Sequence, residues 1–218
     1  ILPEALFNFL ALLGWSPKDN REFFTKDELI NLFDLDNVNK APAIFDFEKL
    51  KWMNHKYIVD KDARDLCIDA LPYLKDAYGI AECNEKIVSI VDAVKGNMNV
   101  IPDVIPYSKP FFEELEIPEG SDEEKILKDR DVLKTFAYVL SHIDSVQFNQ
   151  EAIEAFLDSL RENVGVGSKK IYHPLRVALY YSKNGPELYK IFLVLGKDEV
   201  KARLTKAINL VKQLTQVW

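Results

Sequence analysis

The sequence predicts an all-α protein. Apolar residues recur at spacings of three and four along most of its 218 residues, which is the pattern of helices with one buried face. Glycines and prolines punctuate these stretches at helix starts and ends. No convincing alternation of apolar and polar residues occurs, so no strand is expected. No apolar tract reaches the roughly 18 residues that a membrane span needs, so we expect none.

The helices of the first half are predicted from start and stop signals. Pro3 fits the first turn of the opening helix, and Gly14 fits its end. Residues 25–28 read Thr-Lys-Asp-Glu, a capping box for the next helix. Gly79 ends a later helix, which Pro72 is expected to kink or split. The ranges expected to be helical are 2–13, 25–33, from 47 onward, 64–78 and 86–94.

The second half follows the same logic. Three prolines between residues 101 and 110 argue against a long helix there. The acidic stretch 113–124, with one proline and one glycine, is the best candidate for a domain boundary. Asn149 is expected to cap a helix and Gly196 to end one. The expected ranges are 125–142, 150–163, 186–196 and 198–214, with a short apolar segment over 174–181.

Sequence motifs for chemistry are scarce. Cys67 and Cys83 lie in no CxxC pair, and we predict two buried, reduced thiols rather than a disulfide or a metal site. His55, His142 and His173 are far apart and have no metal-ligand spacing, so no metal is expected. No Walker loop, GxGxxG, GxSxG or HExxH motif occurs. A stand-alone catalytic function is therefore not expected.

The net charge is −7, which argues against a general nucleic-acid binder. The charge is unevenly distributed, because residues 168–212 hold ten basic and three acidic side chains and thus carry +7. This asymmetry has two interpretations. One is a local basic surface that binds nucleic acid, and the other is a set of solvated helix faces that bind nothing.

Two parts of the sequence resemble the glutamyl-tRNA synthetase family. The first comprises residues 2–16, LPEALFNFLALLGWS, and residues 45–58, FDFEKLKWMNHKYI. The second comprises HPLRVAL at 173–179 and GPEL at 185–188. The resemblance, to the bacterial type of this class I family, extends over essentially the whole chain. It implies a C-terminal portion of such an enzyme: a stem-contact region at 1–60 and two anticodon-binding subdomains at 61–112 and 113–218.

The resemblance implies a parent enzyme that ligates glutamate to tRNA and uses ATP and Mg²⁺. The HIGH-type and KMSKS-type motifs of its Rossmann domain are absent here, so we expect no catalytic residue and no cofactor in this chain. The chain, which opens on Ile1, is predicted to be an inactive fragment. The expected partner is tRNA-Glu, with tRNA-Gln as a second partner if the parent tolerates both. We expect a cytoplasmic monomer, although an organellar matrix is also compatible.

The resemblance also implies residues that read the anticodon. Arg176 would contact bases, which suits a guanidinium that can both pair and stack, although a domain-bracing role is the alternative. Pro186 and Leu188 match positions that shape a base pocket, whereas local pattern alone favours a helix start and a core residue. Asn97 stands where discriminating members commonly have an arginine that checks the third anticodon base. Lys95 is the alternative equivalent of that arginine.

Lysines are expected to meet the tRNA backbone. They are Lys40, Lys49, Lys51 and Lys56 in the first region and Lys169, Lys170 and Lys183 in the last. Trp52 and Tyr57 are predicted to pack rather than bind. Tyr180 and Tyr181 replace a Thr-Gly pair of the family, and they could stack on a base or fill space. The competing function is a helical protein–protein adaptor that binds no tRNA.

Overall fold

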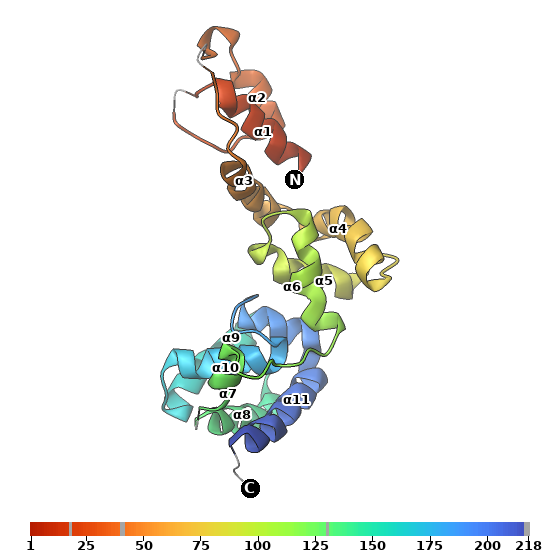
Figure 1. The fold of residues 1–218 in the computed structure, drawn as a ribbon, viewed down its shortest axis with the longest axis vertical. Coiled ribbons are helices and arrows are strands. Elements are labelled where there is room, and N and C mark those ends of the chain that lie inside the picture. The colour runs from red at the N-terminus through yellow and green to blue at the C-terminus, as the bar shows by residue number, and fades with distance from the viewer. Residues whose placement is uncertain (18, 40–41, 130, 216–218) are drawn as a thin grey trace. The chain divides into compact units, whose positions relative to one another are not determined.

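The computed structural model describes residues 1–17, 19–39, 42–129 and 131–215, and within these ranges the protein is all-α, as predicted (Figure 1). The described residues form no strand, only an isolated antiparallel bridge between Trp15 and Val38. The helices are α1 (Pro3–Gly14), α2 (Lys26–Leu32), α3 (Phe47–Asp60), α4 (Ala63–Tyr78), α5 (Glu85–Val94), α6 (Val104–Phe112), α7 (Asp122–Leu127), α8 (Val132–His142), α9 (Gln150–Val164), α10 (Ser168–Tyr180) and α11 (Leu188–Thr215). The 3-10 turns are η1 (Leu35–Asn37), η2 (Lys95–Asn97), η3 (Ile101–Asp103) and η4 (Ile143–Ser145).

The chain forms two compact units. The first unit comprises Ile1–Asn84 and Lys95–Pro106, and the second comprises Glu85–Val94 and the chain from Tyr107 onward. Neither unit is a continuous stretch of sequence, because α5 belongs to the second unit while the segments on both sides of it belong to the first. The family resemblance implies functional boundaries after residues 60 and 112. These boundaries stay a prediction.

In the first unit, α1 packs on α2 and α3. Two small apolar cores hold these helices together: Phe9, Leu50 and Met53 form one, and Trp15, Phe24 and Leu29 form the other. The capping box before α2 is confirmed. The Thr25 hydroxyl accepts the backbone N–H of Glu28 at 3.2 Å, and the Glu28 carboxylate accepts that of Thr25 at 2.8 Å.

Two asparagines that are fully buried connect distant segments of the first unit. The Asn8 carbonyl oxygen accepts the backbone N–H of Phe24 at 3.0 Å. The Asn54 side chain accepts the N–H of Leu2 at 2.7 Å and donates to the carbonyl of Asn99 at 2.6 Å. These bonds satisfy buried polar groups, and they fix α3 against both the chain start and the turn that follows η2.

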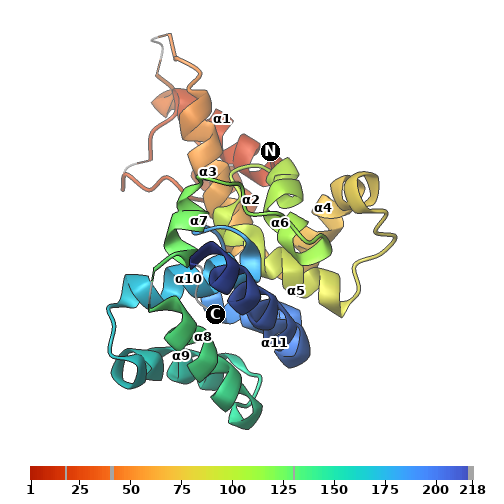
Figure 2. The same cartoon turned by 60° about the horizontal axis from the view of Figure 1, so that its bottom comes forward.

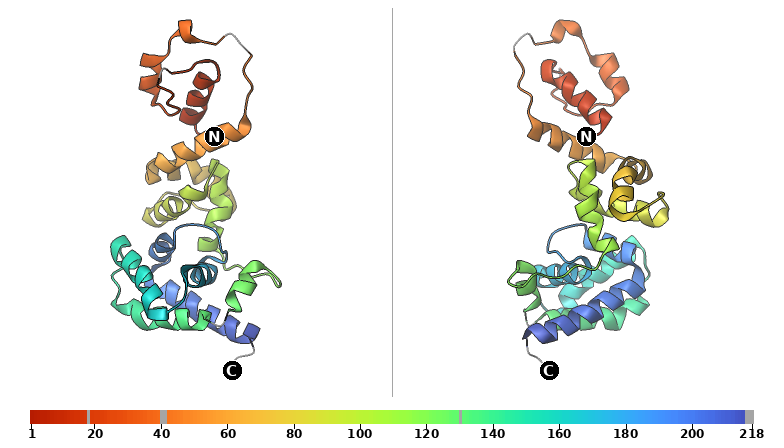
Figure 3. Two further views of the ribbon diagram at one scale, coloured as in Figure 1. Left: turned by 90° about the vertical axis from the view of Figure 1, so that its left-hand side faces the viewer. Right: turned by 45° about the vertical axis from the view of Figure 1, so that its right-hand side comes forward.

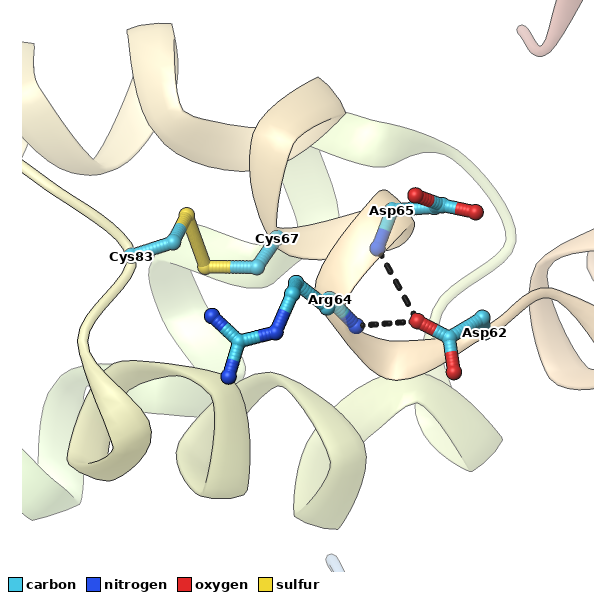
Figure 4. Close-up of a disulfide and its surroundings, with 5 residues drawn as sticks. All are labelled: Asp62, Arg64, Asp65, Cys67 and Cys83. Carbon is cyan, nitrogen blue, oxygen red and sulfur yellow. Dashed lines mark hydrogen bonds between the residues drawn. A yellow bond between two sulfur atoms is a disulfide. The ribbon is translucent and has the colours of Figure 1, made fainter.

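A disulfide joins Cys67, in α4, to Cys83, in the loop after it (Figure 4). The prediction of two reduced thiols is therefore wrong. Gly79 ends α4 in the left-handed conformation, with φ of 69°, and the chain turns back after it. The two Cα atoms are thereby brought to 6.0 Å. Sequence spacing alone does not reveal this proximity, because it depends on the tertiary path after the turn.

Helix α4 begins at a strong cap and runs through its proline. The Asp62 carboxylate accepts the backbone N–H groups of Arg64 and Asp65 (Figure 4). The expectation that Pro72 splits the helix is wrong, since α4 continues to Tyr78. Burial of apolar side chains on both sides of Pro72 outweighs the roughly 3 kcal/mol that an internal proline costs.

In the second unit, α10 packs against α7, α8, α9 and α11 (Figure 2, Figure 3). Phe136 in α8 and Phe192 in α11 are fully buried in this unit. Asn149 caps α9 as predicted, by accepting the N–H of Ala152. Gly196 interrupts α11 with φ of 74° and ψ of 165°, which agrees with the predicted helix end.

The expectation of no long helix over residues 101–110 is consistent with α6, which is nine residues long and contains Pro110. Two other expectations for the second half are wrong in detail. Pro174 lies inside α10, where the sequence suggested only a short apolar segment. The helix expected over 125–142 is broken between α7 and α8. At this break the Asp129 carboxylate accepts the backbone N–H of Asp131 at 3.0 Å, a local bond that competes with helix continuation.

Candidate nucleic-acid interface

Arg176 lies in the penultimate turn of α10 and is half-buried. Its Nε donates to the carbonyl of Pro186 and its Nη1 to the carbonyl of Lys183, both at 3.2 Å. Burial lowers the pKa of Arg176, which nevertheless stays charged at any physiological pH. The guanidinium therefore holds the loop after α10 in place, and its remaining N–H groups are available to a ligand.

The loop held by Arg176 has a fixed shape. Gly185 adopts φ of 140°, and a Cβ at this position would overlap the ring of Tyr180. Pro186 is buried and Leu188 is only 6% exposed. In the chain alone, Pro186 and Leu188 therefore pack in the interior. The part of the loop that a base could contact is its backbone.

The structure assigns separate roles to the tyrosine pair. Tyr180 is buried and donates its hydroxyl to the carbonyl of Tyr107, so it fills space. Tyr181 follows α10 in the left-handed conformation with φ of 58°, a position that glycine takes without strain. The guanidinium of Arg203 lies 5.2 Å from the centre of the Tyr181 ring. This cation–π contact occupies the ring that could otherwise stack on a base.

The predicted backbone-binding lysines of the second unit differ in their partners. Lys170 pairs with Asp129 and Asp131, and Lys183 pairs with Asp122. Hydrogen bonds to these carboxylates raise the pKa of both lysines. Lys169 is exposed and forms no ion pair with the described residues.

Ion pairs with carboxylates also neutralise other cations of the basic segment 168–212. Six of its ten cations pair with a carboxylate, namely Lys170, Lys183, Lys190, Lys201, Arg203 and Lys206. Most of the +7 excess is thus met by acidic residues of the same unit. The positive potential that remains is confined to a few side chains, among them Lys169 and Arg176.

His173 is a candidate that the sequence analysis left aside. It lies four residues after Lys169 and three before Arg176, so the three share one face of α10. The pKa of His173 is lowered by burial, and then by the positive charges of Arg176, Lys169 and Lys183. The spacing in the sequence could have indicated this grouping, whereas the approach of Lys183 depends on the loop.

In the first unit, Lys95 and Asn97 lie in η2, which packs on α3. The Lys95 ammonium donates to the carbonyl of Lys61 at 3.2 Å. Asn97 is half-buried, and its amide forms no hydrogen bond with the described residues. His55 Nδ1 lies 2.8 Å from the carbonyl of Met98. Together with the buried Asn54, this contact fixes the turn and leaves the Asn97 amide free to bind.

The lysines of α3 lie on the same unit. Lys49 pairs with Glu22 at 2.7 Å and Lys51 with Glu48 at 2.9 Å. Lys56 is exposed and has no ion pair within the described ranges. Lys40, the remaining predicted contact, lies outside the described residues.

Of the two aromatic residues of α3, Tyr57 packs as predicted and Trp52 does so only in part. The Tyr57 hydroxyl donates to the carbonyl of Phe24 at 2.8 Å. The Trp52 ring lies 5.3 Å from that of Phe23, measured between centroids, and the side chain is 42% exposed. Tyr57 therefore packs inside the unit, whereas Trp52 contacts Phe23 and stays partly exposed.

Two general features of the described residues bear on function. No three His, Cys, Asp or Glu side chains among them lie close enough together to hold a metal ion. None of the helices in the described part is both long enough and apolar enough to cross a bilayer. The candidate residues described above are hydrogen-bond donors and cations, and each unit has its own set of them.

Comparison with known proteins identifies two family models along the chain. Residues 65–208 match the anticodon binding domain, and residues 1–52 match the catalytic domain of class I tRNA synthetases (E and Q). The first range includes η2, α10 and the loop that Arg176 holds. The second covers most of the region predicted as stem-contact fold.

Individual relatives agree with these matches. The glutamate–tRNA ligase of Carboxydothermus hydrogenoformans is 36% identical over an alignment of 216 residues that covers 95% of this chain and 44% of that enzyme. A glutamate tRNA ligase from Elizabethkingia meningosepticum, solved with its amino acid, superposes with a TM-score of 0.78 at 31% identity, over 97% of this chain and 42% of that one. The glutamate-tRNA synthetase of Elizabethkingia anophelis gives 0.73 at 33% identity, over 95% and 41%.

The chain spans less than half the length of these relatives. The family model for anticodon binding nevertheless covers about two thirds of this chain, and it includes η2, α10 and the loop after α10. This chain therefore belongs to the glutamate–tRNA ligase family.

Proposed function

We propose that the chain is the anticodon-reading portion of a glutamate–tRNA ligase and binds the anticodon arm of tRNA-Glu. The observation that carries the proposal is Arg176, whose guanidinium is positioned by two loop carbonyls and keeps N–H groups unused. An arginine fixed in this way can pair with the edge of a splayed base or stack on its face. Lys169 and His173 would meet the adjoining backbone.

We further propose that the turn carrying Asn97 meets a second anticodon base. Its amide can both donate and accept, so it discriminates less sharply than an arginine at the same place. The parent enzyme would then charge tRNA-Gln as well as tRNA-Glu. Lys95 is the less suitable reader, because its ammonium already donates to the carbonyl of Lys61.

The parent enzyme would ligate glutamate to tRNA with ATP and Mg²⁺ as a cytoplasmic monomer. Neither the HIGH-type nor the KMSKS-type motif occurs in this sequence. We therefore assign no step of glutamate activation to its residues, and we expect the isolated chain to form no glutamyl-adenylate.

A filter-binding titration tests anticodon binding directly. The chain is titrated with the anticodon stem-loop of tRNA-Glu and with an unrelated stem-loop, each at two salt concentrations. Tighter binding of the tRNA-Glu stem-loop, weakened by salt, supports the proposal. Absence of binding to both RNAs would instead favour the protein–protein adaptor, which predicts no response to Arg176→Ala.

Specificity for the third anticodon base needs the chain within an active enzyme. It can replace the matched portion of the Carboxydothermus hydrogenoformans ligase, with charging of tRNA-Glu and tRNA-Gln measured side by side. Charging of both supports the role of Asn97, and Asn97→Arg should then suppress tRNA-Gln. Strict rejection of tRNA-Gln by the unmodified chimera would show the idea to be wrong.

A further inference from the structure

A cleft with two lobes lies in the second unit, between residues 113–117 and the helices α10 and α11. The first lobe has a volume of about 370 Å³, and apolar side chains form most of its lining. The second lobe has a volume of about 320 Å³, and its lining is richer in charged side chains. The lobes adjoin, because four residues line both: Glu114, Tyr181, Arg203 and Lys206. We call this site the Arg203 cleft, and all of its lining residues belong to the second unit.

Arg203 is a buried cation that keeps unused hydrogen-bond donors. It is only 8% exposed, and its Nε donates to the carboxylate of Glu199 at 2.7 Å. Its Nη1 donates to the carbonyls of Pro110 at 2.9 Å and Leu179 at 2.7 Å. These bonds fix the guanidinium in place.

The second terminal nitrogen of Arg203, Nη2, forms no hydrogen bond with any described residue. Within the described ranges, no side-chain nitrogen that is sealed from solvent lacks a partner. Nη2 therefore keeps access to solvent, and the open space that Arg203 lines is the cleft. A carboxylate bound there would accept charge-assisted hydrogen bonds from Nη2.

The charges around the cleft nearly balance, since three cations and four carboxylates are among its described lining residues. Glu113, Glu114 and Glu199 each pair with a cation of the same unit. Glu116 is exposed and forms no ion pair with the described residues. A ligand with a net charge would be repelled by part of this lining, whereas a zwitterion can place each of its charges beside an opposite one.

Two alanines make room in the apolar lobe. Ala178 of α10 is 5% exposed and Ala207 of α11 is 7% exposed, and both line the lobe. Leu115 and Ile117, both half-buried, border it from the segment after α6. An aliphatic group that enters this lobe leaves water for apolar surroundings, which favours binding by about fourfold for each CH₂ group buried.

We propose that the Arg203 cleft binds a free α-amino acid with an aliphatic side chain. The carboxylate of the ligand accepts from Nη2 of Arg203, its ammonium lies near Glu116, and its side chain fills the apolar lobe. This ligand uses the three features of the cleft together: buried donors, an unpaired carboxylate and an apolar space. The proposal goes beyond anticodon binding and does not depend on it, because none of the residues that we assign to RNA lines the cleft.

The test uses leucine as the ligand and the whole chain as the protein. Affinity is measured by NMR titration, which follows the backbone amides of Ala178, Tyr181 and Ala207. Three analogues each lack one feature: isocaproate has no ammonium, isoamylamine has no carboxylate and glycine has no side chain. We expect saturable binding of leucine and affinities at least about tenfold lower for each analogue. Glutamate should also bind at least about tenfold more weakly, because its side chain would bring a charge into the apolar lobe.

Substitutions separate the contacts. Glu116→Gln removes an exposed partner of the ammonium, so it should weaken leucine binding by about threefold and leave isocaproate binding unchanged. Glu119→Gln is the matched control and should change neither affinity, because Glu119 is an exposed acid near the same segment that does not line the cleft.

Ala207→Leu tests the apolar lobe. The larger side chain fills part of the space, so leucine binding should weaken by about tenfold and glycine binding should not change. Arg203 itself is left intact, because its bonds to two carbonyls stabilise the unit. The ligand series tests its contact with the carboxylate instead.

Several results would overturn the proposal. They are a lack of leucine binding at millimolar concentrations, equal affinities for leucine and isoamylamine, and equal effects of Glu116→Gln and Glu119→Gln. Tighter binding of isocaproate than of leucine would also overturn it, since the ligand would then be a simple carboxylate. These titrations contain no RNA, so their outcome is independent of anticodon binding.

Discussion

In the proposed function, Arg176 combines the two roles that the sequence left as alternatives. Its bonds to the carbonyls of Lys183 and Pro186 brace the loop, and the same bonds orient the guanidinium. A lysine at this position would keep the charge but lose the fork that spans two acceptors. Bracing and base reading therefore depend on one geometry and should be lost together.

We predict that Arg176→Lys lowers the stability of the second unit by about 1.5–3 kcal/mol, the usual range for hydrogen bonds to a charged group. Binding of the anticodon stem-loop should weaken by about tenfold or more, which corresponds to at least ~1.4 kcal/mol. Urea denaturation and filter binding measure the two effects. Lys212→Ala is the control, because Lys212 is an exposed cation of α11, and it should alter neither quantity. Wild-type affinity in Arg176→Lys would exclude a specific role of the guanidinium.

His173 should make stability depend on pH. Its pKa in the folded chain lies below the value of the unfolded chain, so between the two values only the unfolded chain is protonated. The free energy of unfolding therefore decreases as pH falls below about 6.5, and it reaches its full decrease below the folded pKa. No contribution is present well above this range.

We predict that His173→Gln removes this loss of stability in acid. Denaturation of both proteins between pH 5 and pH 8 should show curves that converge at high pH and separate below pH 6.5, with the variant less acid-sensitive. A bound phosphate would favour the charged imidazole, so wild-type binding to the stem-loop should strengthen at low pH and the variant should not. Parallel pH curves for the two proteins would contradict this assignment.

At the scale of elements, helix starts and stops that depend on neighbouring residues were predictable from the sequence. Helices that continue through a proline because of tertiary packing were not. The capping box at residues 25–28 and the stop at Gly79 involve neighbours in sequence, so the sequence suffices to locate them. Pro72 and Pro174 violate a local rule and are tolerated because the helices around them are buried. The same distinction applies to the site. The family resemblance nominated Arg176 as a base reader, which stays a prediction, whereas its carbonyl partners follow from the path of the loop.

The disulfide between Cys67 and Cys83 spans a sequence separation of 16 residues. A loop of this length predicts a stabilisation of about 3 kcal/mol, by restriction of the unfolded chain. In a reducing cytoplasm the thiols would be free and this contribution would be absent.

We therefore predict that dithiothreitol lowers the urea midpoint of the protein and that Cys83→Ser, without reductant, has a similarly lowered midpoint. Reductant should have no further effect on the variant. A midpoint of the wild-type protein that is insensitive to dithiothreitol, with complete reduction verified by alkylation and mass measurement, would mean that the bond does not stabilise the fold.

For the whole molecule, composition gives a misleading picture of charge. The segment 168–212 carries +7, yet six of its cations pair with acids of the second unit, and five of these pair with acids outside the segment. A sequence cannot reveal which surface acids meet which lysines, because partners such as Asp92 and Lys190 lie 98 residues apart. The discontinuous make-up of the two units was unpredictable for the same reason.

The pairing predicts a shallow salt dependence of RNA binding. If only unpaired cations such as Lys56, Lys169 and Arg176 release counterions, the slope of log K against log salt should be roughly −2 to −3. A basic face that used all ten cations of segment 168–212 would give roughly −7 or steeper. Filter binding of the anticodon stem-loop, measured at KCl concentrations between about 50 and 200 mM, separates the two cases.

Asn54 has a consequence for the order of folding. Its amide joins Leu2 to Asn99, across sequence separations of 52 and 45 residues, so its bonds form only when three distant segments have met. The turn that bears Asn97 can therefore reach its final shape only late, after α1 has docked on α3. In kinetic terms, truncation of Asn54 should speed unfolding much more than it slows folding. Nascent chains would then complete the proposed contact of Asn97 with RNA as one of their last steps.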